Sequence, residues 1–159
     1  MDFFPAKYVP WFRWLQNTPA GATIRDSPIL FPSFMTVHLI GIAMLLGTIL
    51  MMDLNLLGVA MRRQTAQEIG EQLKGWMLGG LALVLGSGGF LFVARALRCY
   101  RNPYFRWKML LLALALAHHF SLHRRAVSAA NGVVRRVAAG VSLALWFGAG
   151  LIGNIFTSF

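Results

Sequence analysis

Residues 34–58 read FMTVHLIGIAMLLGTILMMDLNLLG, and this stretch decides the fold. It is apolar for long enough to cross a bilayer, whose hydrocarbon core of about 30 Å needs roughly 20 helical residues. Two ionisable side chains interrupt it, His38 near its start and Asp53 near its end. Ionisable groups are costly inside a membrane, so each of them is a candidate for function. The stretch predicts a membrane-spanning helix over residues 30–58.

The composition of the whole chain indicates several spans. Of its 159 residues, 57% are hydrophobic and 13% are charged, whereas soluble domains have about 25% charged residues. A net charge of +10 would suggest nucleic-acid binding in a soluble protein, but here the basic residues lie in short connections between apolar segments. In such connections they meet lipid headgroups. No recognition motif accompanies the charge, so we expect the lipid bilayer, and no nucleic acid, as a partner.

Three further apolar segments follow the first span. We expect spans at residues 75–97, 106–124 and 133–156, which makes the fold class all-α: a polytopic membrane four-helix bundle in one domain, 1–159. We expect residues 1–27 to form an interfacial segment with a short amphipathic helix over 9–17 that carries aromatic rings. The alternative is a partly ordered tail. The prolines and the glycine of residues 18–28 predict a turn before the first span. Lys and Arg are balanced between the two sides, so the orientation stays open.

All four histidines lie in or at the end of a span: His38 in the first, and His118, His119 and His123 in the third. Imidazole is a good axial ligand for haem iron, and helix bundles house cofactors between facing side chains. The first and third spans run in the same direction. At 1.5 Å per residue, His38 lies ~11–15 Å into the first span, and His118 and His119 lie ~17–21 Å into the third. We therefore predict one haem b between His38 and either His118 or His119, with His123 and Arg124 near its propionates.

Other uses of the histidines stay open. His119 and His123 are four residues apart, so on an α-helix they share a face that could chelate a small metal ion. A copper transport or homeostasis protein would use His38, His118 and His119 as metal ligands during transit. In a third alternative, a structural membrane subunit, the histidines only form hydrogen bonds within the bundle.

Asp53 lies about 22 Å beyond His38 along the helix axis, so it cannot ligate the same iron. One prediction pairs it with Arg62, Arg63 or a basic residue of another helix. The other makes it a proton acceptor beside a quinone headgroup near the membrane edge.

The run from Trp14 to Gly58 resembles a family of small bacterial four-helix inner-membrane proteins of unknown function. The family pattern has an H-x-x-G-x-x-x-x-x-G core and a D-L-x-L-L-G end. These correspond here to His38, Gly41 and Gly47, and to Asp53, Leu54, Leu56, Leu57 and Gly58. Where the family has a basic residue, this chain has Asn55. More loosely, the chain is similar to b-type cytochromes and to copper-resistance membrane proteins of the CopD kind.

These observations lead to one functional hypothesis. We expect a haem-b-binding electron-transfer protein in the bacterial inner membrane that exchanges electrons with quinone or with a redox partner such as a dehydrogenase. The sequence shows no nucleophile with a base and no phosphate loop, so no hydrolase or transferase chemistry is indicated. Glycines in the second and fourth spans suit close helix packing, which is also compatible with a homo-oligomer.

Overall fold

The computed structural model describes residues 6–61, 63–127 and 131–158; the side chains of 122–124, 126 and 154–158 are not described. A 3₁₀ turn (Ala6–Tyr8) leads into α1 (Val9–Gln16), α2 (Pro19–Asp26), α3 (Leu30–Leu56), α4 (Ala66–Ala94), α5 (Ala96–Arg101) and α6 (Pro103–His118). A π-helical segment (His119–His123) then connects to α7 (Arg124–Val127) and α8 (Gly132–Ser158). No strand occurs in these ranges. The all-α prediction is confirmed.

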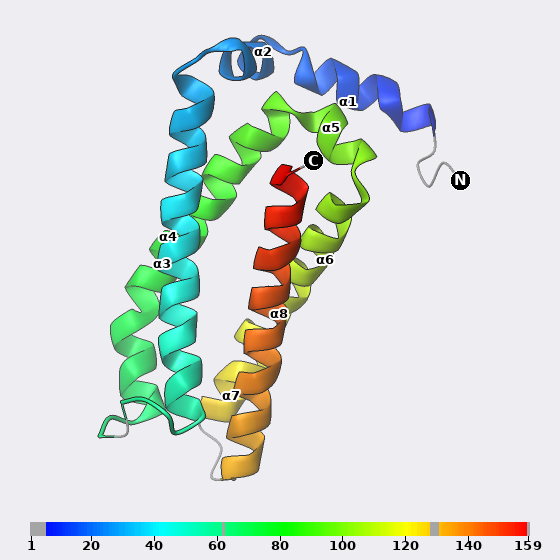
Figure 1. Cartoon of the computed structure of the whole chain (residues 1–159). Helices are drawn as coiled ribbons and strands as arrows, with labels where there is room; N and C mark the ends of the chain where they lie inside the picture. Colours follow the sequence, from blue (N-terminus) through cyan, green and yellow to red (C-terminus); the bar gives the residue numbers. More distant parts are fainter. Residues whose placement is uncertain (1–5, 62, 128–130, 159) are drawn as a thin grey trace.

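The bundle consists of α3, α4, α6 and α8, which run up and down, while α1 and α2 lie across one end (Figure 1). Helix α3 packs mainly on α4 and α6 mainly on α8, and α8 also contacts α3. The chain thus forms two antiparallel helix pairs, joined by the contact between α3 and α8. In this arrangement α3 and α6 run in the same direction, as expected.

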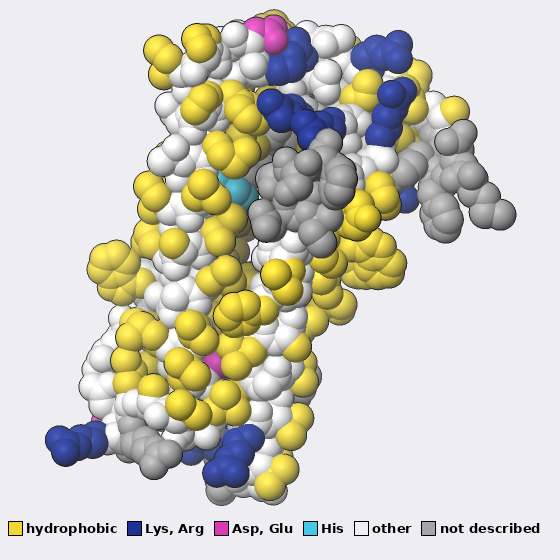
Figure 2. All heavy atoms as spheres, viewed as in Figure 1, with side chains coloured by type: hydrophobic (Ala, Val, Ile, Leu, Met, Phe, Trp, Pro, Cys, Tyr) yellow, Lys and Arg dark blue, Asp and Glu magenta, His cyan; other side chains and the backbone are white. Residues whose placement is uncertain are grey.

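Helices α3, α4 and the part of α8 up to Gly153 are long and apolar enough to cross a membrane. Many of their large apolar side chains point outward, including Leu39, Leu85 and Leu151. Figure 2 shows hydrophobic side chains along the flanks of the bundle and Lys and Arg side chains towards its two ends. This is the distribution that a bilayer requires, so the chain is a membrane protein.

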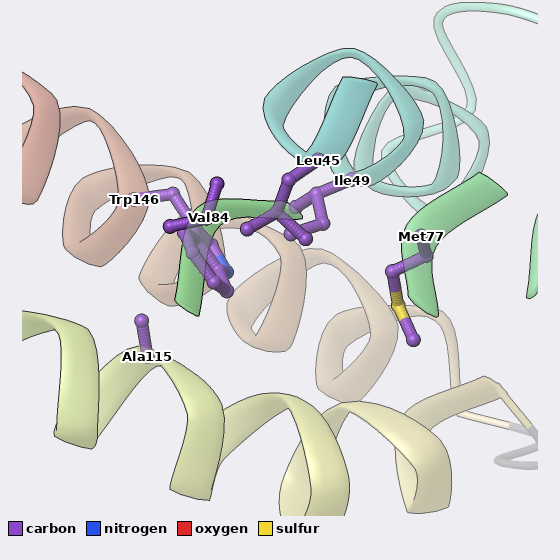
Figure 3. Packing of buried hydrophobic residues seen from close by; sticks show 6 residues of the cluster. All are labelled: Leu45, Ile49, Met77, Val84, Ala115 and Trp146. Carbon is purple, nitrogen blue, oxygen red and sulfur yellow. The ribbon is translucent and has the colours of Figure 1, made fainter. Parts of the chain in front are cut away.

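Two apolar clusters hold the bundle together. The first, which we call the central cluster, takes buried side chains from four helices and is drawn in Figure 3: Leu45 and Ile49 of α3, Met77 and Val84 of α4, Ala115 of α6, and Trp146 of α8. The second, which we call the end cluster, lies nearer the α3–α4 connection and contains Leu56, Ala66 and Ala139. Both clusters join α3 to α8, and they fix the relative height of these two helices.

Helices α3 and α4 approach closely because two glycines face each other across their contact. A Cβ atom on Gly80 would lie 2.8 Å from the backbone nitrogen of Leu45 and 3.1 Å from the carbonyl oxygen of Gly41. A Cβ atom on Gly41 would lie 2.8 Å from that of Leu83. Real Cβ atoms do not come this close, so the absence of side chains at Gly41 and Gly80 permits the contact.

The N-terminal segment contains one helix more than the sequence predicted. Instead of a turn over residues 18–28, the structure has α2, which begins after Thr18 with Pro19 in its first turn. The Thr18 hydroxyl oxygen accepts a hydrogen bond from the backbone N–H of Gly21, as N-cap residues do. Helix α1 docks through Phe12, whose ring stacks on that of Tyr100 at 4.3 Å between centroids.

The helix ends differ from the predicted spans where capping residues determine the first residue of the helix. Helix α4 begins at Ala66 and not at residue 75, because Thr65 and Glu68 form a capping box that carries the helix through the polar connection. The predicted third span, 106–124, is represented by α6 and the π-helical segment that follows it. A π-helical turn contains an extra residue, so it shifts the faces of the helix beyond it.

Candidate functional site

Asp53 lies in the last turn of α3, near the end of the span as the sequence predicted, and its side chain is buried. Its side chain is 0% exposed, and it belongs to the buried stripe of α3. Ile49 of the central cluster precedes it by one turn, and Leu56 of the end cluster follows it by three residues. Because both neighbours pack against α8, Asp53 on the same stripe faces the contact between α3 and α8.

Ser142 occupies the corresponding position on α8. It is 0% exposed and lies between Ala139 of the end cluster and Trp146 of the central cluster. Within the described residues its hydroxyl oxygen makes no hydrogen bond. A serine in a helix often bonds to the carbonyl four residues earlier, but here that carbonyl, Ala138, accepts from His118. The Ser142 hydroxyl is therefore available for a small polar ligand or a water molecule.

Along the bundle axis, His118 lies within about one helical turn of Ser142. It is 7% exposed, and its Nε2 atom lies 2.9 Å from the carbonyl oxygen of Ala138. A carbonyl only accepts, so Nε2 of His118 carries the proton and donates it. Asp53, Ser142 and His118 thus form what we call the polar layer, a set of buried polar side chains from α3, α8 and α6 beside apolar clusters. His119 is 5% exposed, and its ring meets Phe120 edge-on.

His38 lies near the other end of α3 and contacts α4. Its Nδ1 atom lies 3.0 Å from the hydroxyl oxygen of Ser87, and the ring passes over Gly88, where a Cβ atom would be 3.1 Å from Cε1. The single hydroxyl proton of Ser87 is donated to the carbonyl of Leu83. Nδ1 of His38 is therefore the donor, and the lone pair of Nε2 is available for a ligand.

Lys108 of α6 approaches the same region. Its side chain lies along α8 at Gly153, where a Cβ atom would be 3.4 Å from both Cε and Nζ of the lysine. The Lys108 charge is close enough to act on His38. Sequence reasoning assigned Lys108 to a connection with lipid headgroups and did not single out Ser87. The available signal for Lys108 was a basic residue five positions after the start of an apolar helix.

The structure does not bring His38 and His118 together. His118 bonds to Ala138, and the next residue, Ala139, packs with Leu56. His118 therefore lies near the height of Leu56, which is 18 residues from His38, or roughly 27 Å along the axis of α3. A haem iron needs both axial nitrogens within about 2 Å of the metal, as short as other metal–imidazole bonds. A haem shared by these two histidines does not fit this packing.

Residue counts from the helix starts predict His118 too close to His38 along the bundle axis. In the structure, side-chain packing determines how far α6 is shifted along α3. Leu111 of α6 meets α8 at Gly148, and His118 reaches Ala138, so α8 sets the height of α6. These contacts join residues far apart in the chain, so the sequence pattern did not reveal the register of α6.

The other predicted ligands are placed only in part. The backbones of His123 and Arg124 lie in the π-helical segment and in α7, but their side chains lie outside the described residues. Arg62, one predicted partner of Asp53, also lies outside them, and Arg63 is exposed. Within the described residues, no three His, Cys, Asp or Glu side chains are grouped so that they could hold a metal ion. Since residues 119–123 are π-helical, the α-helical spacing assumed for His119 and His123 does not apply.

The D-L-x-L-L-G end of the first span has a structural explanation. Gly58 follows the last turn of α3 with φ +75°, a conformation that favours glycine, and the N–H of Val59 donates to the carbonyl of Leu54. The Asn55 side chain donates to the carbonyls of Met61 and Gln64 and so holds the α3–α4 connection. The motif therefore ends a helix and closes a loop, and Asn55 contributes through hydrogen bonds and not through charge.

Comparisons with known proteins identify the family without assigning an activity. No curated protein and no solved structure matches the chain. One family model matches residues 12–157, which include every helix from the second half of α1 to nearly the end of α8. On this basis, the chain belongs to the family described as "Family of unknown function (DUF6644)".

Proposed function

We propose that this chain is a four-span inner-membrane protein of bacteria that binds and passes protons in its polar layer. The observation that carries the proposal is Asp53, a carboxyl group in the last turn of α3 with no exposed surface inside a membrane bundle. Ionisable side chains at such positions face the bundle interior and commonly belong to proton or ion pathways. Ser142 and His118 supply a hydroxyl and an imidazole nearby, the groups that proton relays use.

Proton flux into vesicles tests the proposal. The purified protein is reconstituted with a pH-sensitive dye inside, and a membrane potential is imposed with potassium and valinomycin. We expect acidification with the unmodified protein and loss of that signal with Asp53→Asn. Asp26→Asn is the matched control, because Asp26 is exposed on α2, where it pairs with Arg25 at 2.9 Å. Equal rates for Asp53→Asn and the unmodified protein, or no flux above empty vesicles, would contradict the proposal.

A second measurement reports on Asp53 without any flux. Dicyclohexylcarbodiimide reacts with carboxyl groups that take up protons in apolar surroundings, which is what the proposal requires of Asp53. We expect the reagent to label a peptide that contains Asp53 and to leave Asp26 unlabelled, as measured by mass spectrometry. If Asp53 instead serves only as the acidic half of a permanent ion pair, the peptide stays unlabelled and Asp53→Asn lowers stability.

A second candidate function, haem-based electron transfer, rests on His38. Its Nδ1 atom is held by Ser87, which leaves Nε2 to act as an axial ligand. The nearby Lys108 charge disfavours a bare metal cation such as copper and suits a carboxylate such as a haem propionate. When bound, haem would supply one-electron chemistry for exchange with quinone or a dehydrogenase. Its second axial ligand would not be His118, which lies too far away.

A reduced-minus-oxidised spectrum separates the two candidates. Haem binding predicts a Soret and an α band in protein purified from haem-replete cells. We expect His38→Ala to remove the bands and His118→Ala to retain them. A colourless, folded preparation would contradict haem-based electron transfer and would leave the proton proposal unaffected. Elemental analysis of the same sample shows whether copper is bound instead, as a transport protein would require.

A further inference from the structure

A pocket of about 740 Å³ opens at the end of the bundle where α3 ends and α4 and α8 begin. It is separate from the polar layer and plays no part in either candidate function. Polar side chains form much of its wall, among them Asn55, Gln64, Thr65, Gln67, Arg135 and Arg136. None of the described residues that line it is acidic. The nearest acid in sequence, Glu68, turns its carboxylate to the backbone N–H of Thr65 at 2.8 Å and completes the cap of α4.

The two arginines of the pocket differ in their surroundings. Arg136 is exposed, whereas Arg135 is half-buried, and its Nε atom is buried without a hydrogen-bond partner in the described part of the chain. A buried guanidinium N–H that lacks an acceptor is costly, and an oxyanion in the pocket would satisfy it. The guanidinium fork matches the geometry of phosphate oxygens.

The backbone adds to this positive potential. Helices α4 and α8 both begin at this end, α4 directly at the pocket and α8 three residues before Arg135. The N-terminus of a helix carries a partial positive charge. The pocket also lies where α3 ends and α4 begins, and both helices are long enough to span a membrane. The ends of membrane-spanning helices lie at the level of the lipid headgroups.

We propose that this pocket binds a phosphate oxyanion through Arg135 and Arg136. At this height the phosphate can belong to an anionic phospholipid or can come from solution as free phosphate. Of the two arginines, Arg135 is the anchoring residue, because among the described residues its Nε atom is buried without a hydrogen-bond partner. Arg136 adds charge at the exposed rim.

Native mass spectrometry of the full-length protein in detergent tests this site. The protein is titrated with phosphatidylglycerol, with phosphatidylcholine, and with inorganic phosphate in separate experiments. The test variant is Arg135→Gln with Arg136→Gln. The control is Arg98→Gln with Arg101→Gln, which removes the same charge from two exposed arginines in a second pocket at the opposite end. A third variant, Arg135→Lys, keeps the charge but removes the fork.

We expect the test variant to weaken phosphatidylglycerol binding by about tenfold or more, since two charge-assisted contacts are lost. The control variant should retain the affinity, and Arg135→Lys should fall between them. Binding of inorganic phosphate with the same dependence on Arg135 would identify free phosphate as the source. Equal weakening in test and control variants, equal binding of phosphatidylcholine, or no change in the test variant would overturn the proposal. Circular dichroism of each variant shows that it is folded.

Discussion

The hydroxyl of Ser87 determines which nitrogen of His38 carries the proton. Because Ser87 gives its own proton to Leu83, it accepts from Nδ1 of the imidazole. Ser87→Ala removes this acceptor, so we expect His38 to change from a dominant Nδ1–H form to a mixture of tautomers. The ¹⁵N chemical shifts of labelled histidine measure the change. Ser33→Ala is the control, because Ser33 lies exposed on α3 and donates to the carbonyl of Ile29. An unchanged tautomer in Ser87→Ala would contradict the assignment.

Cys99 illustrates how burial controls reactivity at a single residue. It lies in α5, and burial raises the pKa of its thiol to about 11, although nearby Lys108, Arg98 and Arg95 oppose the shift. The thiolate is the reactive form. We expect slow alkylation by iodoacetamide in the folded protein at neutral pH and a rise in rate as the pH approaches about 11. Rapid alkylation of the folded protein at neutral pH would contradict this prediction.

The same thiol makes stability depend on pH. In the unfolded chain it ionises near its ordinary value of 9.0, whereas in the folded chain it holds its proton to about 11. Over that interval the folded state binds more protons than the unfolded state, so the Cys99 contribution to stability is lost as the pH rises. We expect unfolding measurements from pH 9 to pH 11 to show a steeper loss for the unmodified protein than for Cys99→Ala. An equal loss of stability with pH in the unmodified protein and in Cys99→Ala would contradict this prediction.

At the scale of elements, the close contact between α3 and α4 depends on glycine at position 80. Gly80→Ala would place its Cβ atom 2.8 Å from backbone atoms of α3, which cannot move without separating the helices. We expect a loss of about 1–3 kcal/mol in the free energy of unfolding, typical of overpacking. Gly86→Ala on the same helix is the matched control, because its Cβ atom would meet nothing within 4 Å. Unfolding in mixed detergent–SDS micelles compares the two variants, and equal stabilities would contradict the prediction.

The sequence predicted the helices better than it predicted their register, that is, how far they are shifted against one another along the bundle axis. Length and hydropathy identified the long helices, and α3 begins at the predicted residue, because apolar length is a local property. Helix α2 and the early start of α4 were missed, although Thr18-Pro19 and Thr65–Glu68 are capping signals that a reader could have used.

The site was less accessible to sequence reasoning for a physical reason. The sequence marks Asp53 as unusual, but its complete burial follows from the packing of α3 against other helices, α8 among them, which lies far along the chain. The sequence predicts His38 as a ligand, whereas its neighbour in the structure is Ser87. Ser87 lies in the second span, for which the sequence predicts only close packing through glycines. Contacts of this kind follow from helix register, which one sequence does not specify.

At the scale of the whole molecule, the up-and-down arrangement makes a prediction about membrane topology. Asn17 and Arg101 are exposed at the end near α1, and Gln64 and Asn131 are exposed at the other end. Cysteines placed singly at these positions, with Cys99 replaced by alanine, should react with a membrane-impermeant maleimide in two groups. We expect positions 17 and 101 to be labelled from one side of the membrane and positions 64 and 131 from the other. Labelling of position 101 with position 64 would show that α4 does not cross.

The docking of α1 has a consequence for how the chain is made. Phe12 stacks on Tyr100, and the side-chain oxygen of Gln16 accepts from the backbone N–H of Leu97 in the first turn of α5. These partners lie 81 residues or more further along the chain. A ribosome therefore completes α1 and α2, and then both long helices that follow, before the surface that receives α1 exists. During translation the aromatic N-terminal segment has only the membrane surface to rest on, and the earliest helix to emerge is among the last to reach its final place.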